Sequence, residues 1–184
     1  MSCDLTRGRK ETCKDVVGGL KAVYFIDYGD LGTVTETNDE ITDMTGTFSA
    51  YKYELKGNSS FEQAINSSRE NGTTFFEQTL NLTLKKVTKE DNNEIKLLAY
   101  ARPHVAIEDN NGNIMLMGLE HGADVSGGTV ATGAAMGDLN GYTLTFTTQE
   151  KKPANFIAST DPTAATYPFD GMSSATPTIV EGTN

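Results

Sequence analysis

Residues 74–84, with the sequence TFFEQTLNLTL, decide how the fold of this chain is interpreted. Apolar side chains fall on one face, at Phe76, Leu80, Leu82 and Leu84, and a mainly polar set falls on the other, at Phe75, Glu77, Thr79, Asn81 and Thr83. A period of two is typical of a β-strand, because successive side chains point to opposite sides of its backbone. We therefore predict a strand with one face in a hydrophobic core and the other face in contact with water or with another subunit.

The same alternation returns in residues 141–150, with the sequence GYTLTFTTQE. Tyr142, Leu144 and Phe146 alternate with threonines, which predicts a last core strand with one buried face and one face lined with hydroxyl groups. The dipeptides Asn71-Gly72 and Asn140-Gly141 precede the two strands. Both residue types accept the positive φ angles of tight turns, so each dipeptide predicts a turn into the strand that follows.

Other stretches of strand length are rich in aromatic and β-branched residues, namely 20–28, 47–55, 60–70, 104–109 and 113–119. The first is expected to be a core strand. Residues 47–55 and 60–70 are expected to pair as antiparallel strands across a short turn. The last two stretches flank Asn110-Asn111-Gly112, which predicts a hairpin.

Two segments give weaker signals. Residues 29–45 are acidic and rich in turn formers, so we expect a loop or a weak edge hairpin with Val34 and Ile41 as its apolar anchors. Residues 124–141 are rich in Gly and Ala, which predicts a pair of strands with a mobile connection or a bulge.

One helix is predicted near residues 89–101. Thr88 and Asp91 fit a capping box, in which the threonine hydroxyl accepts a hydrogen bond from the amide three residues later. Ile95, Leu98 and Ala99 form an apolar stripe, so the helix should lie against the sheet. Pro103 prevents its continuation.

These elements predict a mainly β (α+β) fold, an antiparallel β-sandwich or partial barrel with one flanking α-helix. The chain divides into an N-terminal arm (1–19), a β-sandwich domain (20–157) and an extended C-terminal arm (158–184). The C-terminal segment is rich in Thr, Ala, Ser and Pro and cannot bury enough of itself to fold alone. We expect it to be disordered or to dock on a neighbouring subunit, with Tyr167 and Phe169 as anchors.

The formal net charge is −10 and the isoelectric point is near 4.6. A surface that grips a phosphate backbone needs clustered Lys and Arg, so nucleic acid binding is not expected. The N-terminus carries no apolar signal segment, and no stretch reaches the roughly 18 apolar residues that cross a bilayer. We therefore expect a protein that is made and kept in the cytosol or released without secretion, and that has no membrane partner.

No pattern in the chain indicates catalysis or a cofactor, and we predict that the protein is not an enzyme. His104 and His121 stand outside known catalytic motifs and are expected to be structural, hydrogen-bonded residues. Residues 109–113 superficially resemble a calcium loop, but they lack its spaced acids and closing glutamate, so a hairpin turn explains them. The acidic residues Asp39, Glu40 and Asp43 are expected to form a solvated loop.

The two cysteines, Cys3 and Cys13, lie in a polar leader without neighbouring histidines or further cysteines. A zinc site there lacks ligands, and a stable disulfide lacks an oxidising compartment. Both are expected to be reduced thiols.

Many strands, one helix and polar faces of threonine and asparagine suit a subunit that completes its sheets with copies of itself, because open sheet edges invite pairing. Three phrases add a resemblance, namely CKDVVGG (13–19), NSSRENGT (66–73) and GDLNGYTLTF (137–146). They resemble structural proteins of phages of Bacteroides-type bacteria, including crAss-like phages, which are similar in layout to phage tail tube proteins.

The resemblance implies a homo-oligomer of six copies to a ring, with rings stacked into a hollow tube whose inner wall is a continuous β-barrel. It implies a virion (tail) location, assembly in the host cytoplasm, and tape-measure, tail terminator or connector proteins as partners, with DNA passing through unbound. The wall residues expected to face the lumen are Glu77, Thr79, Asn81, Thr143, Thr145 and Thr147.

Two alternatives stay open at this point. The first is a head–tail connector, ring or capsid-decorating virion protein, because the C-terminal arm is long. The second is an adhesive or carbohydrate-binding β-sandwich, which the absence of tryptophan disfavours.

Overall fold

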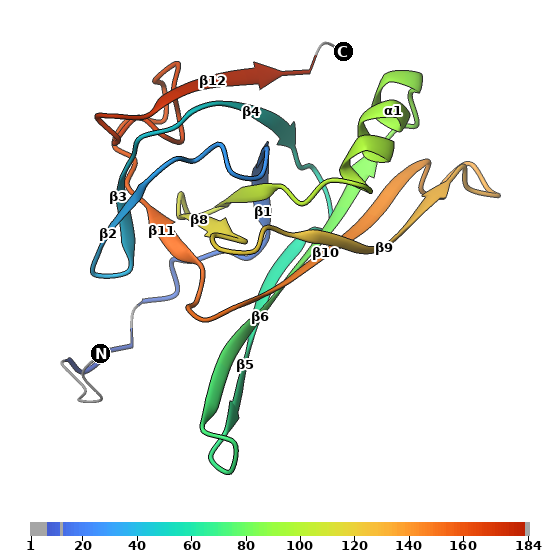
Figure 1. The fold of residues 1–184 in the computed structure, drawn as a ribbon. Helices are drawn as coiled ribbons and strands as arrows, with labels where there is room; N and C mark the ends of the chain where they lie inside the picture. The colour runs from blue at the N-terminus through green and yellow to red at the C-terminus, as the bar shows by residue number, and fades with distance from the viewer. Residues whose placement is uncertain (1–6, 12, 183–184) are drawn as a thin grey trace.

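The chain folds into two β-sheets and one helix in a computed structural model that describes residues 7–11 and 13–182 (Figure 1). The larger sheet has eight strands in the order β12-β4-β1-β7-β8-β11-β3-β2. Its strands are β1 (Leu20–Ile26), β2 (Val34–Thr37), β3 (Glu40–Met44), β4 (Thr47–Glu54), β7 (His104–Asp109), β8 (Ile114–Met117), β11 (Asn155–Ile157) and β12 (Thr176–Glu181). The predicted mainly β class with one helix is confirmed, and neither sheet closes on itself within these residues.

The smaller sheet has four antiparallel strands in the order β5-β6-β10-β9. They are β5 (Ser60–Ser68), β6 (Thr73–Lys85), β9 (Asp124–Ala131) and β10 (Gly141–Glu150). The hairpin of β5 and β6 projects from the body of the molecule (Figure 1). Gly72 has a φ of +64° in the turn between them, so the turn predicted from Asn71-Gly72 is confirmed.

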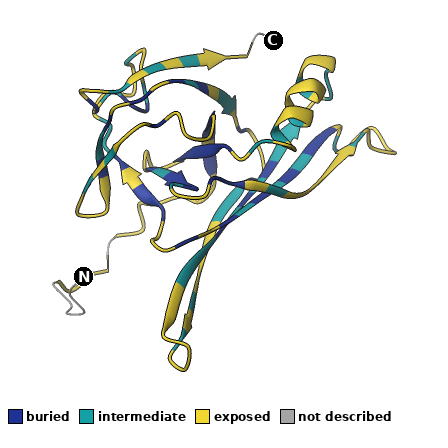
Figure 2. Ribbon diagram, in the orientation of Figure 1, coloured by how far each residue is buried: buried dark blue, intermediate teal, exposed yellow. Residues whose placement is uncertain are grey.

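The two sheets enclose one hydrophobic core. The smaller sheet contributes Leu80, Leu82, Leu144 and Phe146, and the larger sheet contributes Val23, Phe25, Val105, Ile107 and Met117. Each of these side chains is buried, and a buried Leu or Phe stabilises a fold by about 1.5–3 kcal/mol. The face predicted to be apolar in residues 74–84 is therefore the core face, and it appears as alternating buried positions along β6 and β10 (Figure 2).

A second core lies on the other side of the larger sheet and overturns the expectation for the C-terminal segment. Phe169 is 1% exposed and packs edge-on against Tyr24 and Phe48, while β12 pairs in parallel with β4. The Tyr167 hydroxyl donates a 2.8 Å hydrogen bond to Glu108. The prediction that Tyr167 and Phe169 anchor an arm on a neighbour is wrong, because both contact the chain's own larger sheet.

Carboxylates organise the backbone of this C-terminal segment. Asp170 accepts hydrogen bonds from Ser159, Thr160 and Asp161, each 2.6 to 2.8 Å long. Burial acts to raise the pKa of Asp170, but these hydrogen bonds outweigh it and lower the pKa to about 2. Asp43 on β3 accepts hydrogen bonds from Ser173 and Ser174. A segment poor in apolar residues is thus held in place by side-chain to backbone bonds.

The pairing of residues 47–55 with 60–70 was also predicted wrongly. β4 belongs to the larger sheet and β5 to the smaller one, so the chain changes sheets between them. Leu55 is buried in the shared core at this crossing. The larger sheet is also mixed rather than purely antiparallel, because β12–β4 and β11–β3 are parallel pairs.

The predictions for residues 29–45 and 124–141 were partly correct. β2 and β3 form the predicted edge hairpin, with Ile41 fully buried. Residues 124–141 contain one strand, β9, instead of two, and its pairing with β10 has the predicted bulge, between Thr145 and Phe146.

The helix α1 (Lys89–Leu98) begins as predicted and ends three residues earlier than residue 101. The Thr88 hydroxyl accepts a 3.0 Å hydrogen bond from the Asp91 amide, which confirms the N-cap. Ile95 and Leu98 pack against the core between the sheets, as expected, while Tyr100 just beyond the helix is 85% exposed. Among the described residues, no helix has the length and apolar character needed to traverse a bilayer.

Candidate functional site

The outer face of the smaller sheet gathers every residue that sequence analysis assigned to a lumen. In the register of β10 with β6, Gln149 lies opposite Glu77, Thr147 opposite Thr79, Thr145 opposite Asn81 and Thr143 opposite Thr83. Glu77, Thr79, Asn81, Thr143, Thr145 and Thr147 are all half-buried, and they alternate along their strands with more deeply buried residues. The structure thus brings the six residues together on one face, which is referred to below as the polar face.

Hydroxyl and amide groups on the polar face bond to one another across the strands. The Thr145 hydroxyl donates a 2.9 Å hydrogen bond to the side-chain oxygen of Asn81. The hydroxyl oxygens of Thr129 on β9 and Thr143 on β10 lie 2.6 Å apart. Cross-strand Thr and Asn pairs of this kind stabilise a sheet by roughly 0.2–1 kcal/mol each. The polar face is therefore an ordered surface rather than a set of free side chains.

The charges on the polar face are negative over most of its length. Glu62 on β5 lies opposite Thr79, and Asp124 on β9 lies opposite Thr147. At the register positions between Glu77 and Thr83, none of the four strands carries Lys or Arg on this face. Lys85 stands at one end, opposite Gly141. An anionic polymer that approached the centre of this face would meet carboxylates and hydroxyls, which do not hold phosphate.

Both edges of the smaller sheet are open, because β5 and β9 each pair with one strand only among the described residues. Neither strand contains Lys, Arg or Pro, the residues that commonly block edge pairing. Ile65 on β5 is 69% exposed and Val130 on β9 is 56% exposed, although their register partners, Phe76 and Tyr142, belong to the core side of the sheet. The core side of the smaller sheet is therefore exposed to solvent at both edges.

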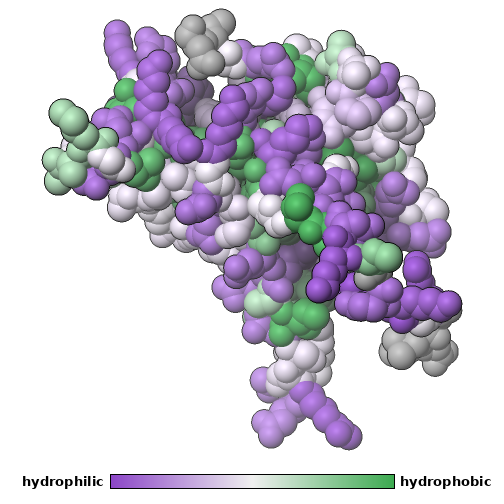
Figure 3. All heavy atoms as spheres, turned by 180° about the vertical axis from the view of Figure 1, so that it is seen from behind, coloured by the Kyte–Doolittle hydropathy of each residue, from purple (hydrophilic) through white to green (hydrophobic). Residues whose placement is uncertain are grey.

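Apolar side chains are exposed elsewhere too, among them Leu97, Tyr100 and Met136. Figure 3 shows the back of the molecule. Its surface is mainly polar, with small apolar patches, one of which lies on the projecting hairpin (Figure 3). An exposed apolar residue on an unpaired edge strand is a known template for association with another chain.

The two histidines were expected to be structural and hydrogen-bonded, and both make side-chain hydrogen bonds. The buried His104 has Nδ1 2.6 Å from the Gly118 carbonyl, and Nε2 accepts a hydrogen bond from the Gly29 amide. Burial lowers the pKa of His104, although the Gly118 carbonyl and the charges of Glu150 and Asp30 act in the opposite direction. A neutral ring with its proton on Nδ1 satisfies both neighbours. His121 bonds to Glu150, a residue that sequence analysis did not single out.

The segment 109–113 and the two cysteines are the remaining residues that the sequence singled out. The Asp109 carboxylate accepts hydrogen bonds from the Asn111 and Asn113 amides, each 2.8 Å long, and Gly112 has a φ of +83°, so this segment is the predicted hairpin turn. Cys13 is an exposed free thiol. Cys3 lies outside the described residues.

Sequence reasoning missed Val130 and Glu150. The Glu150 signal was present, because continuing the alternation of residues 141–150 places it on the buried side with Thr148. Comparisons of the chain with protein-family models, curated proteins and solved structures found no match.

Proposed function

We propose that this chain is the subunit of a closed ring, of the kind that stacks into the tube of a phage tail, and that the polar face lines its channel. The observation that carries the proposal is the form of the smaller sheet. It has a buried face, a polar face and two edges that are unpaired among the described residues. Such a sheet is complete within one copy except for the hydrogen-bonding groups along β5 and β9.

Pairing of β5 of one copy with β9 of the next satisfies those groups. The two edges are different surfaces of the same chain, so the contact is head-to-tail, and a head-to-tail contact gives a ring when its rotation closes. Ile65 on β5 and Val130 on β9 then lie at the two sides of the seam, where the neighbouring copy covers them. The number of copies implied by the resemblance is six.

The composition of the polar face suits a conduit. Carboxylates at Glu62, Glu77 and Asp124 repel phosphate, so DNA passes without being held. Tape-measure and terminator proteins are the partners that such a tube requires. A ring that forms but never stacks would instead indicate a head–tail connector, which uses the same closure.

Disulfide trapping tests the closure directly. In a Cys3→Ser, Cys13→Ser background, one cysteine replaces Glu62 or Ala64 on β5 and a second replaces Gly127 or Thr129 on β9. Within one copy these edges are separated by three strand spacings, about 14 Å, whereas a disulfide needs Cα atoms within about 7 Å. Every disulfide between β5 and β9 must therefore join two copies.

The expected result is a ladder of covalent multimers on oxidation of at least one double variant. The single-cysteine variants are the matched controls and should give at most dimers. A complete scan in which the double variants give no more multimer than the single variants contradicts the proposed closure.

A further inference from the structure

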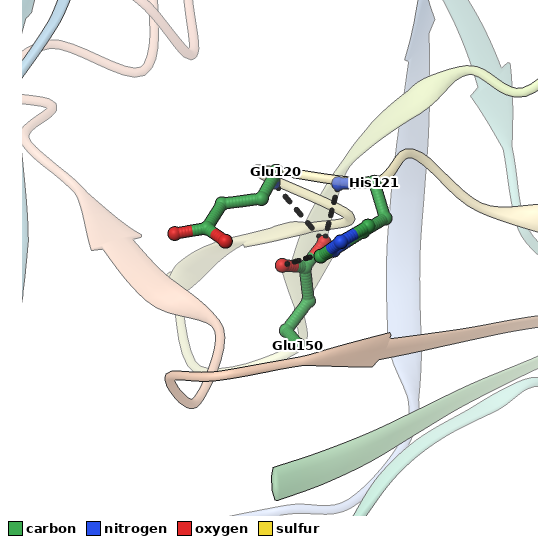
Figure 4. A group of neighbouring side chains, drawn as sticks. All are labelled: Glu120, His121 and Glu150. Atoms are coloured by element: carbon green, nitrogen blue, oxygen red, sulfur yellow. Dashed lines mark hydrogen bonds and ion pairs between the residues drawn. The ribbon is translucent and has the colours of Figure 1, made fainter.

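Glu120, His121 and Glu150 converge at the junction of the two sheets (Figure 4). Glu120 and His121 lie in the turn after β8, and Glu150 is the last residue of β10. One ligand atom from each side chain lies within 4.8 Å of the other two. Glu120 and His121 are exposed, whereas the Glu150 side chain is 4% exposed.

The backbone fixes the orientation of Glu150. Its Oε1 accepts hydrogen bonds from the amides of Glu120 (3.1 Å) and His121 (2.9 Å). These bonds leave Oε2 facing the His121 ring, where Nδ1 lies 3.2 Å away. Two ligands of a tetrahedral zinc ion, at bond lengths of about 2.0–2.1 Å, are about 3.3 Å apart, so Oε2 and Nδ1 already have the spacing of a ligand pair.

Asn155 provides a separate observation, because its side-chain oxygen lacks a hydrogen-bond partner in the described part of the chain. It is 2% exposed, and its Oδ1 is buried without a hydrogen-bond partner among the described residues. Asn155 lines the same small cavity as Glu120 and Glu150. The free volume inside this cavity is about 10 Å³, enough for one particle of the size of a water molecule.

We propose that Glu120, His121, Glu150 and Asn155 form a site for one divalent transition-metal cation, with Zn²⁺ as the best match to the donors. Carboxylate oxygens and an imidazole nitrogen are ordinary zinc ligands, and the mixed set does not suit Ca²⁺, which prefers oxygen alone. Bound there, the ion ties the turn after β8 to the end of β10 and the start of β11. It therefore fastens the larger sheet to the smaller one.

A cation and a water molecule are the two candidates for the partner of Asn155. The oxygens of Asn155, Glu120 and Glu150 are all acceptors when the acids are ionised, an arrangement that suits a cation. Glu150 already accepts bonds from two amides, so a single water would have only Asn155 to satisfy, and the two candidates are separated by experiment below. Lys151 lies 3.6 Å from Glu120, but its side chain is 78% exposed and is free to move away. Lys152, which also lines the cavity, is held by a 2.7 Å bond to Glu36.

The experiment is calorimetric titration of the untagged protein with ZnCl₂ in the Cys3→Ser, Cys13→Ser background, which removes thiols and tag histidines as competing ligands. We expect one ion per chain. His121→Ala and Glu120→Gln change exposed side chains, so they should fold normally and weaken zinc binding at least tenfold. Glu70→Gln, in the turn of the projecting hairpin, is the matched control and should bind zinc as the parent does.

Asn155→Asp separates the cation from a water molecule. An added carboxylate strengthens zinc binding while it lowers the melting temperature of the metal-free protein. Lower stability with unchanged zinc affinity would mean that the cavity holds only water, and it would overturn the proposal. Absence of zinc binding, or equal binding by the His121→Ala and Glu120→Gln variants, would overturn it as well. The site lies within one copy, so these results do not depend on ring formation.

Discussion

Thr145 on β10 lies directly opposite Asn81 on β6, and its hydroxyl donates a 2.9 Å hydrogen bond to the Asn81 side-chain carbonyl. The two residues are 64 positions apart in the chain, so the bond joins distant segments. A slip of one residue between the strands would move the two side chains to opposite faces and bring Leu82 or Leu80 to the surface. The pair therefore marks the register on which both the core and the polar face depend.

Leu82→Asp is expected to abolish folding. Leu82 is 1% exposed in the core between the sheets, and a carboxylate there is a buried charge without a partner. The expected loss exceeds about 4 kcal/mol of unfolding free energy, which is comparable to the whole stability of a small domain. Urea unfolding, monitored by circular dichroism, measures this loss of unfolding free energy. A cooperative transition of parental stability would show that the faces of β6 are assigned the wrong way round.

Thr145→Asp is the matched change on the polar face. The residue is half-buried there and loses one hydrogen bond, so the cost should be about 1 kcal/mol. The same urea measurement applies, and the variant should keep the cooperative transition that Leu82→Asp loses. Collapse of the fold in this variant would contradict the assignment of Thr145 to the polar face.

Phe169→Ala should destabilise the protein by about 3–5 kcal/mol, because it leaves a cavity between Tyr24 and Phe48. Phe156→Ala is the control, since Phe156 is 47% exposed, and its effect should stay within about 0.5 kcal/mol. Chemical denaturation of both variants measures these changes in unfolding free energy. Equal effects of the two changes would restore the original view of residues 158–184 as a detached arm.

Protonation of His104 should make stability depend on pH. The folded state holds His104 neutral with a lowered pKa, whereas the unfolded chain has the ordinary value of about 6.5. Its contribution is complete above about pH 6.5 and is lost as the pH falls from there towards the pKa of the folded state, because the unfolded state then binds more protons.

Melting temperatures measured between pH 8 and pH 5 test this dependence. His104→Gln should flatten the decline below pH 6.5, and His121→Gln, which changes an exposed ring, should leave the decline in place. A decline that is unchanged in His104→Gln would assign the pH dependence to other groups.

Local patterns predicted the elements whose periodicity is strict. The alternation of residues 74–84 and 141–150 gave two central strands with the correct faces, and Thr88 gave the start of the helix. The six polar-face residues follow from the same alternation. The six residues lie on one common face only because β6 pairs with β10. Two similar alternating patterns suggest this pairing, but they do not fix its register.

Long-range choices were not visible in the local patterns. The turn after Leu55 sends the chain to the other sheet because the leucine enters the shared core, and nothing nearby in the sequence distinguishes this from a hairpin. Residues 158–184 look too polar to fold, yet Asp170 and Asp43 bind their backbone, and Phe169 and Met172 enter the second core. Side-chain to backbone bonds between distant segments leave no periodic signal.

The most direct test of the ring proposal is electron cryomicroscopy of the purified protein after concentration. We expect closed rings, alone or stacked, with β5 of each copy paired to β9 of the next and with Thr145 facing the channel. A protein that remains monomeric at every concentration and beside the virion proteins proposed as its partners, or a ring with this face on the outside, would contradict the ring proposal.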